Sequence, residues 1–120
     1  MPYLSRFYRV VRPELRGQGQ SPVEFDPYRD ITVDNYISDL LAIIAEVGGG
    51  PVHYCGESFG GILGMVLAAQ QPARIRTLNL VSAPVSLHEK HLHSTAFGHA
   101  SREEALRAMG VEKWALAMND

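Results

Sequence analysis

The sequence has little of three features that often direct interpretation: cysteine, charge of one sign and long hydrophobic runs. Its single cysteine, Cys55, excludes an internal disulfide and fits a reducing compartment. The net charge of −2, with no long run of one sign, gives no indication of nucleic acid or an acidic membrane. No stretch reaches the roughly 18 apolar residues of a membrane span, and the first residues form no signal-peptide run. We therefore expect a cytoplasmic protein without membrane or nucleic-acid partners.

The apolar residues that are present have the spacing of alternating strands and helices. Short apolar runs predict strands at 7–11, 52–55 and 75–81, and the intervening patterns predict helices at 33–47 and 62–71. The order strand, helix, strand, helix, strand is typical of an α/β fold with a parallel sheet. The apolar character of the last strand favours a sheet covered on both faces.

The chain changes character after Ser82. Four histidines lie between His88 and His99, and a capping-box pattern that begins at Ser101 then predicts a new helix. Gly110 is expected to end that helix before a short one around Trp114. We interpret residues 1–82 as the sheet core and residues 83–120 as a helical appendage.

The most informative motif is Gly56-Glu57-Ser58-Phe59-Gly60, followed by Gly61, between a predicted strand and a predicted helix. A serine hydroxyl is a weak nucleophile, and a tight strand-to-helix turn exposes it to a base and a carbonyl. A glycine-rich turn with an incidental serine is the alternative, but the flanking strand and helix favour a nucleophile elbow. We predict Ser58 as the nucleophile and the Phe59 N–H as an oxyanion donor at the helix N-terminus. The elbow glycines would be Gly56, Gly60 and Gly61.

Three segments resemble the α/β-hydrolase family. Val10 to Ser21, with its Leu-Arg-Gly-x-Gly-x-Ser run, resembles the segment after the family's fourth strand, although Glu14 stands where aspartate is usual. Pro51 to Gly61 resembles the fifth strand and elbow, and Arg74 to Pro84 resembles the sixth strand. The resemblance implies a partial α/β-hydrolase core, with a parallel sheet and flanking helices, followed by the start of a helical cap.

The resemblance also implies a reaction. It is the hydrolysis of a carboxylic ester, or a related lactone or thioester, through an acyl-serine at Ser58, with no cofactor and a small ester-like substrate. Perhydrolysis, carbon–carbon bond hydrolysis and enol-lactone hydrolysis remain open. The family's histidine and acid follow later strands than those matched here, so we expect weak activity. The alternative is a non-catalytic remnant that binds small acyl compounds or a partner chain.

The remaining candidate residues have simpler interpretations. His53 and Cys55 lie in the strand run, and we expect a buried structural histidine and an inert core thiol. The four later histidines lack the spacing of a tetrahedral site, so we expect a polar loop and no metal. His88 is the first candidate for a substitute base.

The strand order predicts association. In the family the third strand lies between the fourth and the fifth, and the sixth is followed by a seventh, so this chain leaves sheet edges without partners. Unpaired edges invite strand exchange or edge pairing. We expect a homo-oligomer.

Overall fold

The computed structural model describes residues 2–22, 24, 26–86 and 94–118. The chain forms two compact units, Met1–Ala83 and Pro84–Asp120. The first unit contains η1 (Leu4–Arg6), α1 (Pro27–Asp30), α2 (Val33–Glu46), β1 (Val52–Glu57), α3 (Phe59–Gln70), η2 (Pro72–Arg74) and β2 (Ile75–Val81). The second contains α5 (Arg102–Met109) and α6 (Val111–Ala117).

Helix α2 follows from its cap and its apolar face. The Thr32 hydroxyl accepts a hydrogen bond from the Asn35 N–H at 3.2 Å, which satisfies one of the free donors at the helix N-terminus. The helix ends before Gly48 and Gly49, which adopt positive φ values of 131° and 68°. Its buried residues are Tyr36, Ile37, Leu40 and Ile44. The predicted helix is confirmed.

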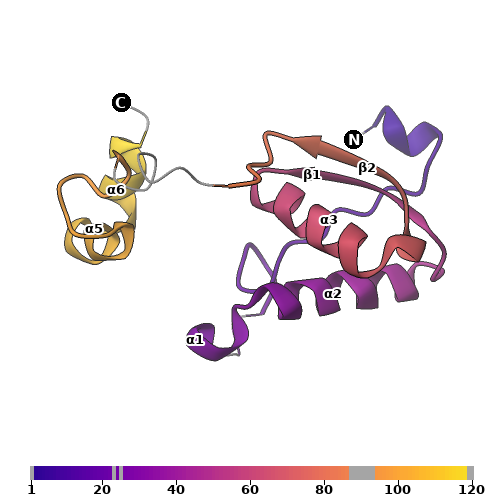
Figure 1. Cartoon of the computed structure of the whole chain (residues 1–120), viewed down its shortest axis with the longest axis horizontal. Coiled ribbons are helices and arrows are strands. Elements are labelled where there is room, and N and C mark those ends of the chain that lie inside the picture. The colour runs from indigo at the N-terminus through magenta and orange to yellow at the C-terminus, as the bar shows by residue number, and fades with distance from the viewer. Residues whose placement is uncertain (1, 23, 25, 87–93, 119–120) are drawn as a thin grey trace. The chain divides into compact units, whose positions relative to one another are not determined.

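The sheet consists of β1 and β2, which pair in parallel from Val52↔Ile75 to Glu57↔Val81. Helix α3 connects the two strands, packs against one face of both, and is in turn contacted by α2 (Figure 1). The core between them is formed by the buried residues of α2 together with Leu63 and Leu67 of α3. A parallel α/β core with flanking helices is thereby confirmed.

Within the unit Met1–Ala83, the residues on the opposite face of the sheet are exposed, and the Tyr8 ring contacts His53 there. Side chains alternate along a strand, so Tyr54 and Gly56 face α3 while His53 and Cys55 face away from it. His53, Cys55 and Asn79 are exposed, and we call the surface that they mark the open face. The prediction of a sheet covered on both faces is wrong for these residues, and so are the predictions of a buried His53 and a buried Cys55.

The strand predicted at residues 7–11 is also wrong. The backbone N–H groups of Phe7 and Tyr8 both donate to the Leu4 carbonyl at 3.0 Å, so a local turn occupies the start of the segment. The residues that follow, 9–15, carry no regular structure. A strand needs a neighbouring strand as hydrogen-bond partner, and none of the described residues supplies one here.

Unit Pro84–Asp120 has the two predicted helices. The Ser101 hydroxyl accepts from the Glu104 N–H at 3.1 Å and begins α5, while Gly110 separates α5 from α6 with φ 78°. The Trp114 indole N–H donates to the Thr95 carbonyl at 3.0 Å. These contacts explain the two helices at the predicted places.

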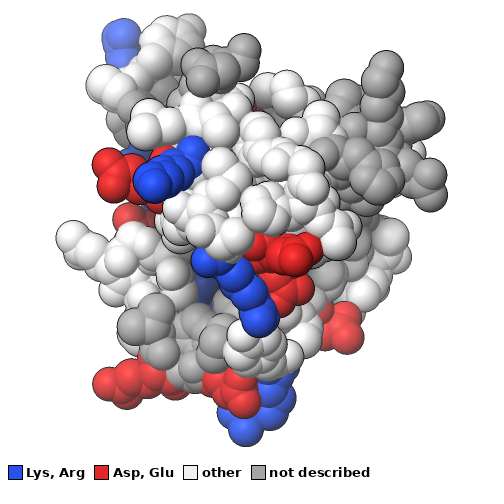
Figure 2. Space-filling model, turned by 90° about the vertical axis from the view of Figure 1, so that its left-hand side faces the viewer, with Lys and Arg blue, Asp and Glu red and all other residues white. Residues whose placement is uncertain are grey.

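The face of the molecule drawn in Figure 2 carries charges of both signs. On the face drawn in Figure 2, Lys and Arg lie among Asp, Glu and uncharged residues, without a patch of one sign. Within the described residues no helix has both the length and the apolar character needed to span a membrane.

Candidate active site

Ser58 lies alone in the turn between the last residue of β1 and the first residue of α3. Its backbone angles are φ 49° and ψ −116°. Residues other than glycine rarely adopt this backbone conformation, which costs about 1–3 kcal/mol. The Ser58 N–H donates to the Val81 carbonyl at 2.9 Å, and the Ser58 carbonyl accepts from Gly61 and Ile62 at 3.0 and 3.1 Å. Both β2 and α3 therefore hold the turn in its strained form.

The Ser58 hydroxyl has no hydrogen-bond partner among the described residues. A serine at a helix N-cap usually accepts a hydrogen bond from the first turn, but Ser58 makes no such bond. The residue is exposed, and no hydrogen-bond partner of its hydroxyl occurs among the described residues. The hydroxyl is therefore accessible to a substrate and to a base.

Two glycines allow β1 and α3 to approach each other. A Cβ on Gly56 would lie 2.5 Å from the Gly60 carbonyl carbon and 2.7 Å from the Gly61 nitrogen, both of them backbone atoms. A Cβ on Gly61 would collide with the Ala83 side chain and lie 3.1 Å from the Gly56 oxygen. A Cβ on Gly60, in contrast, would meet no atom within 4 Å. The close approach is therefore made at Gly56 and Gly61.

Phe59 is the first residue of α3, so its backbone N–H has no acceptor within the helix. The helix dipole adds positive potential at this end, which favours developing negative charge. The Phe59 ring is partly exposed and meets the Tyr36 ring edge-on, with centroids 5.4 Å apart. This ring contact anchors Phe59 to α2.

The structure also shows a contact that the sequence analysis missed. The Tyr54 hydroxyl donates to the Gly60 carbonyl at 2.8 Å. Its ring fills the space beside Gly64, where an added Cβ would lie 2.5 Å from the Tyr54 Cε1. Burial, with a smaller contribution from Cys55, raises the pKa of the Tyr54 phenol. Gly64 was the available signal, because glycine within a helix often marks a close neighbour.

Within the described residues of the unit Met1–Ala83, no histidine accompanies Ser58. His53 faces the open side of the sheet, where its Nδ1 lies 2.8 Å from the Thr77 hydroxyl and its ring contacts Tyr8. His99 belongs to unit Pro84–Asp120. His88, the first candidate for a substitute base, lies outside the described residues, as do His91 and His93. No group of three or more metal-ligating side chains occurs in the described part of the chain.

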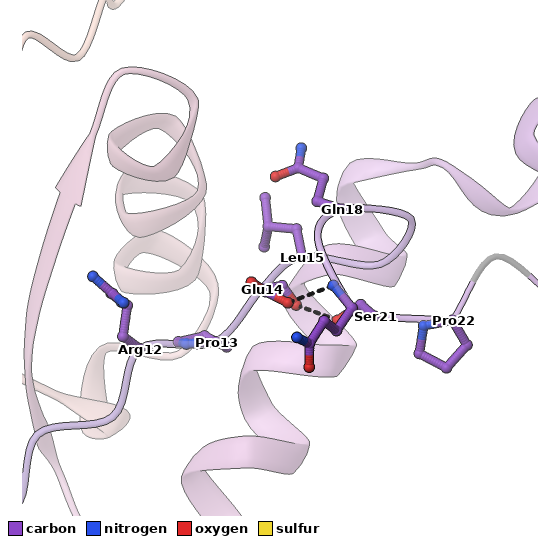
Figure 3. Close-up of a pocket in the computed structure, with 8 residues that line it drawn as sticks. Arg12, Pro13, Glu14, Leu15, Gln18, Ser21 and Pro22 are labelled. Atoms are coloured by element: carbon purple, nitrogen blue, oxygen red, sulfur yellow. Dashed lines mark hydrogen bonds between the residues drawn. The ribbon is translucent and has the colours of Figure 1, made fainter.

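The loop that contains the Leu15-Arg16-Gly17 segment has a structural role. The Arg16 guanidinium makes a two-pronged ion pair with Asp39 of α2, at 2.6 and 2.7 Å, and this pairing raises its pKa. The Glu14 carboxylate accepts from the Gln20 N–H at 2.7 Å. These bonds shape a shallow hollow along residues 12–22, which includes none of the elbow residues (Figure 3).

Comparison with known proteins shows which family model the chain matches. Residues 1–105 match the model of the alpha/beta hydrolase fold family. The strigolactone esterase D14 of Arabidopsis thaliana is 30% identical over 95% of this chain and 44% of its own length. The 3-oxoadipate enol-lactonase 1 of Acinetobacter baylyi is 31% identical over 87% of this chain and 35% of its own length.

A third relative, lipase LipV of Mycobacterium tuberculosis, is 38% identical over 65% of this chain and 28% of its own length. The chain thus spans less than half the length of these three relatives. No solved structure matches it significantly.

Proposed function

Because the chain belongs to the α/β-hydrolase family, we propose that it carries the nucleophile of an enzyme that hydrolyses carboxylic esters, lactones or thioesters. The observation that carries the proposal is the strained turn at Ser58, where the hydroxyl lies at the N-terminus of α3 without a hydrogen-bond partner in the described part of the chain. The names of the relatives, an esterase, an enol-lactonase and a lipase, support an ester-like acyl substrate. The substrate is a small molecule, and the reaction needs neither metal nor cofactor.

The proposed reaction has two steps. The Ser58 oxygen bonds to the substrate carbonyl carbon, its proton passes by way of a base to the leaving group, and the bond to that group breaks. The Phe59 N–H stabilises the oxyanion that forms on the carbonyl oxygen. Water then attacks the acyl-serine, releases the acid and restores the hydroxyl. Since His53, the histidine of the unit Met1–Ala83, faces away from α3, we propose that these 120 residues alone react slowly.

Labelling with a fluorophosphonate tests the proposal directly. The probe should modify the protein once per chain, and Ser58→Ala should abolish the modification. Ser82→Ala is the matched control, because Ser82 also follows a strand, is exposed and has a positive φ of 48°. Mass spectrometry of the labelled peptide checks the site. Absence of labelling in the unmodified chain would support the alternative, a non-catalytic member that binds small acyl compounds or a partner chain.

We further propose a homo-oligomer formed by strand exchange or edge pairing. In the described part of the chain the sheet has only two strands, so β1 and β2 each have one edge without a partner. Exposed edges pair readily with other strands. Light scattering over a dilution series should show dissociation, whereas a folded, non-aggregating monomer at every concentration would overturn the proposal.

A further inference from the structure

The first turn of α3 is intrinsically weak. Gly60, Gly61 and Gly64 fall within its first six residues, and each glycine costs about 1 kcal/mol of helix propensity relative to alanine. This turn carries the Phe59 N–H and follows the strained Ser58. Contacts from outside the helix must therefore fix its position.

Strand β1 supplies those contacts through residues that face α3. The Gly56 backbone lies against the Gly60 carbonyl, and the Tyr54 hydroxyl bonds to the same carbonyl oxygen at 2.8 Å. One turn further along α3, the Tyr54 ring occupies the space that the missing side chain of Gly64 leaves. Tyr54 and Gly56, which lie on the same face of β1, thus contact two successive turns of α3.

We propose that Tyr54 is a positioning residue for the reaction at Ser58. Its hydroxyl holds the first turn of α3, and with it the Phe59 N–H, where the oxyanion of the ester-like substrate forms. Tyr54 touches neither Ser58 nor substrate in this role, since it acts through the Gly60 carbonyl. The proposal rests on the proposed function. Its physical basis is that an oxyanion donor is effective only when it is fixed before the reaction.

Tyr54→Phe removes the hydroxyl and keeps the ring against Gly64. We expect the maximal rate of fluorophosphonate labelling to fall about fivefold while the half-saturating probe concentration stays unchanged. Tyr36→Phe is the matched control, because Tyr36 is a buried tyrosine that also contacts α3, through the Phe59 ring. Its hydroxyl makes no hydrogen bond to the Gly60 carbonyl, and the substitution keeps the ring that contacts Phe59, so labelling should keep the rate of the unmodified chain.

The measurements are made well below the melting temperatures of all variants. An unchanged rate in Tyr54→Phe, or an equal fall in Tyr36→Phe, would overturn the positioning role. Hydrogen exchange of the backbone amides of residues 59–64 gives a second readout that needs no reaction. Faster exchange in Tyr54→Phe alone supports the fixing of the turn, and unchanged exchange overturns it. If the unmodified chain takes no label, the proposed function and the catalytic part of this proposal fail, while exchange still decides whether Tyr54 fixes the turn.

Discussion

The two faces of the β1–β2 pair share one backbone and one set of hydrogen bonds, yet their residues have different surroundings. Tyr54 and Gly56 face α3 and contact its first turn. On the open face, His53 bonds to Thr77, and the Asn79 amide donates to the Tyr54 carbonyl at 3.3 Å. The open-face side chains thus contact a cross-strand hydroxyl, the backbone or, at His53, the Tyr8 ring, and they remain exposed.

This difference shows at which positions the fold requires a particular residue. Only the face toward α3 requires a residue of defined size at each position, because helix and strand interlock there. Substitutions on that face should change folding and the Ser58 turn, whereas substitutions on the open face should be nearly neutral in the isolated chain. Three predictions test this contrast. The first two each pair a residue that lies between the sheet, α3 and α2 with a matched control.

Gly56→Ala should have the largest effect. The new Cβ would press on backbone atoms of Gly60 and Gly61, which cannot rotate away as a side chain would. We expect a loss of at least about 4 kcal/mol in the free energy of unfolding, measured by urea denaturation. Gly60→Ala is the control, because its Cβ would enter open space, and we expect a gain of up to about 1 kcal/mol from helix propensity. Equal losses in both variants would remove the contrast between the two glycines.

Leu67→Ala should have the next largest effect. Leu67 has no exposed surface and lies in the core between α2 and α3, so truncation should cost about 3 kcal/mol. Cys55→Ala on the open face is the comparison, since Cys55 is exposed. It should change the unfolding free energy by less than about 0.5 kcal/mol. A cost at Cys55 similar to that at Leu67 would mean that the open face is covered in solution, for example in the proposed oligomer.

The third prediction concerns alkaline pH and the Tyr54 phenol. Its pKa is raised above the ordinary value of 10.0, so the folded chain keeps a proton that the unfolded chain releases. The resulting stabilisation is complete below pH 10 and is lost as the pH rises from there through the folded pKa.

Tyr54→Phe should therefore lose about 1 kcal/mol at pH 8 and less at pH 11, measured by urea denaturation at both values. A loss in Tyr54→Phe that stays the same at pH 8 and pH 11 would contradict the assignment to Tyr54.

Features that depend on residues close in the chain could be predicted from the sequence. Features that depend on pairing with or coverage by other elements could not. The elbow pattern, the cap at Thr32 and the break at Gly110 depend on nearby residues, and the structure has a turn, a helix start and a helix end there. The apolar run at 7–11 reads as a strand, but a strand also requires a pairing partner. Cys55 reads as buried, but its alternating position shows only which face it joins and not whether that face is covered.

Tyr54 illustrates a third case. Aromatic residues are common in strands, so its type alone predicts packing and nothing more. Its role depends on two contacts with α3. The hydroxyl donates to the Gly60 carbonyl, six residues later, and the register of strand and helix places Gly64 beside the ring. Such a contact depends on the relative position of strand and helix, which no local pattern specifies.

The parallel crossover has a consequence for the order of folding. Paired residues such as His53 and Thr77 are 24 positions apart, and all of β1, α3 and β2 lie in one continuous stretch of chain. Contacts over short separations close with little loss of loop entropy and form early. We therefore expect the turn at Ser58 to be built as this stretch collapses, while the Arg16–Asp39 pair, 23 positions apart, closes over a similar separation and attaches its loop to α2. The chain would then position Ser58, its proposed nucleophile, as part of its folding nucleus.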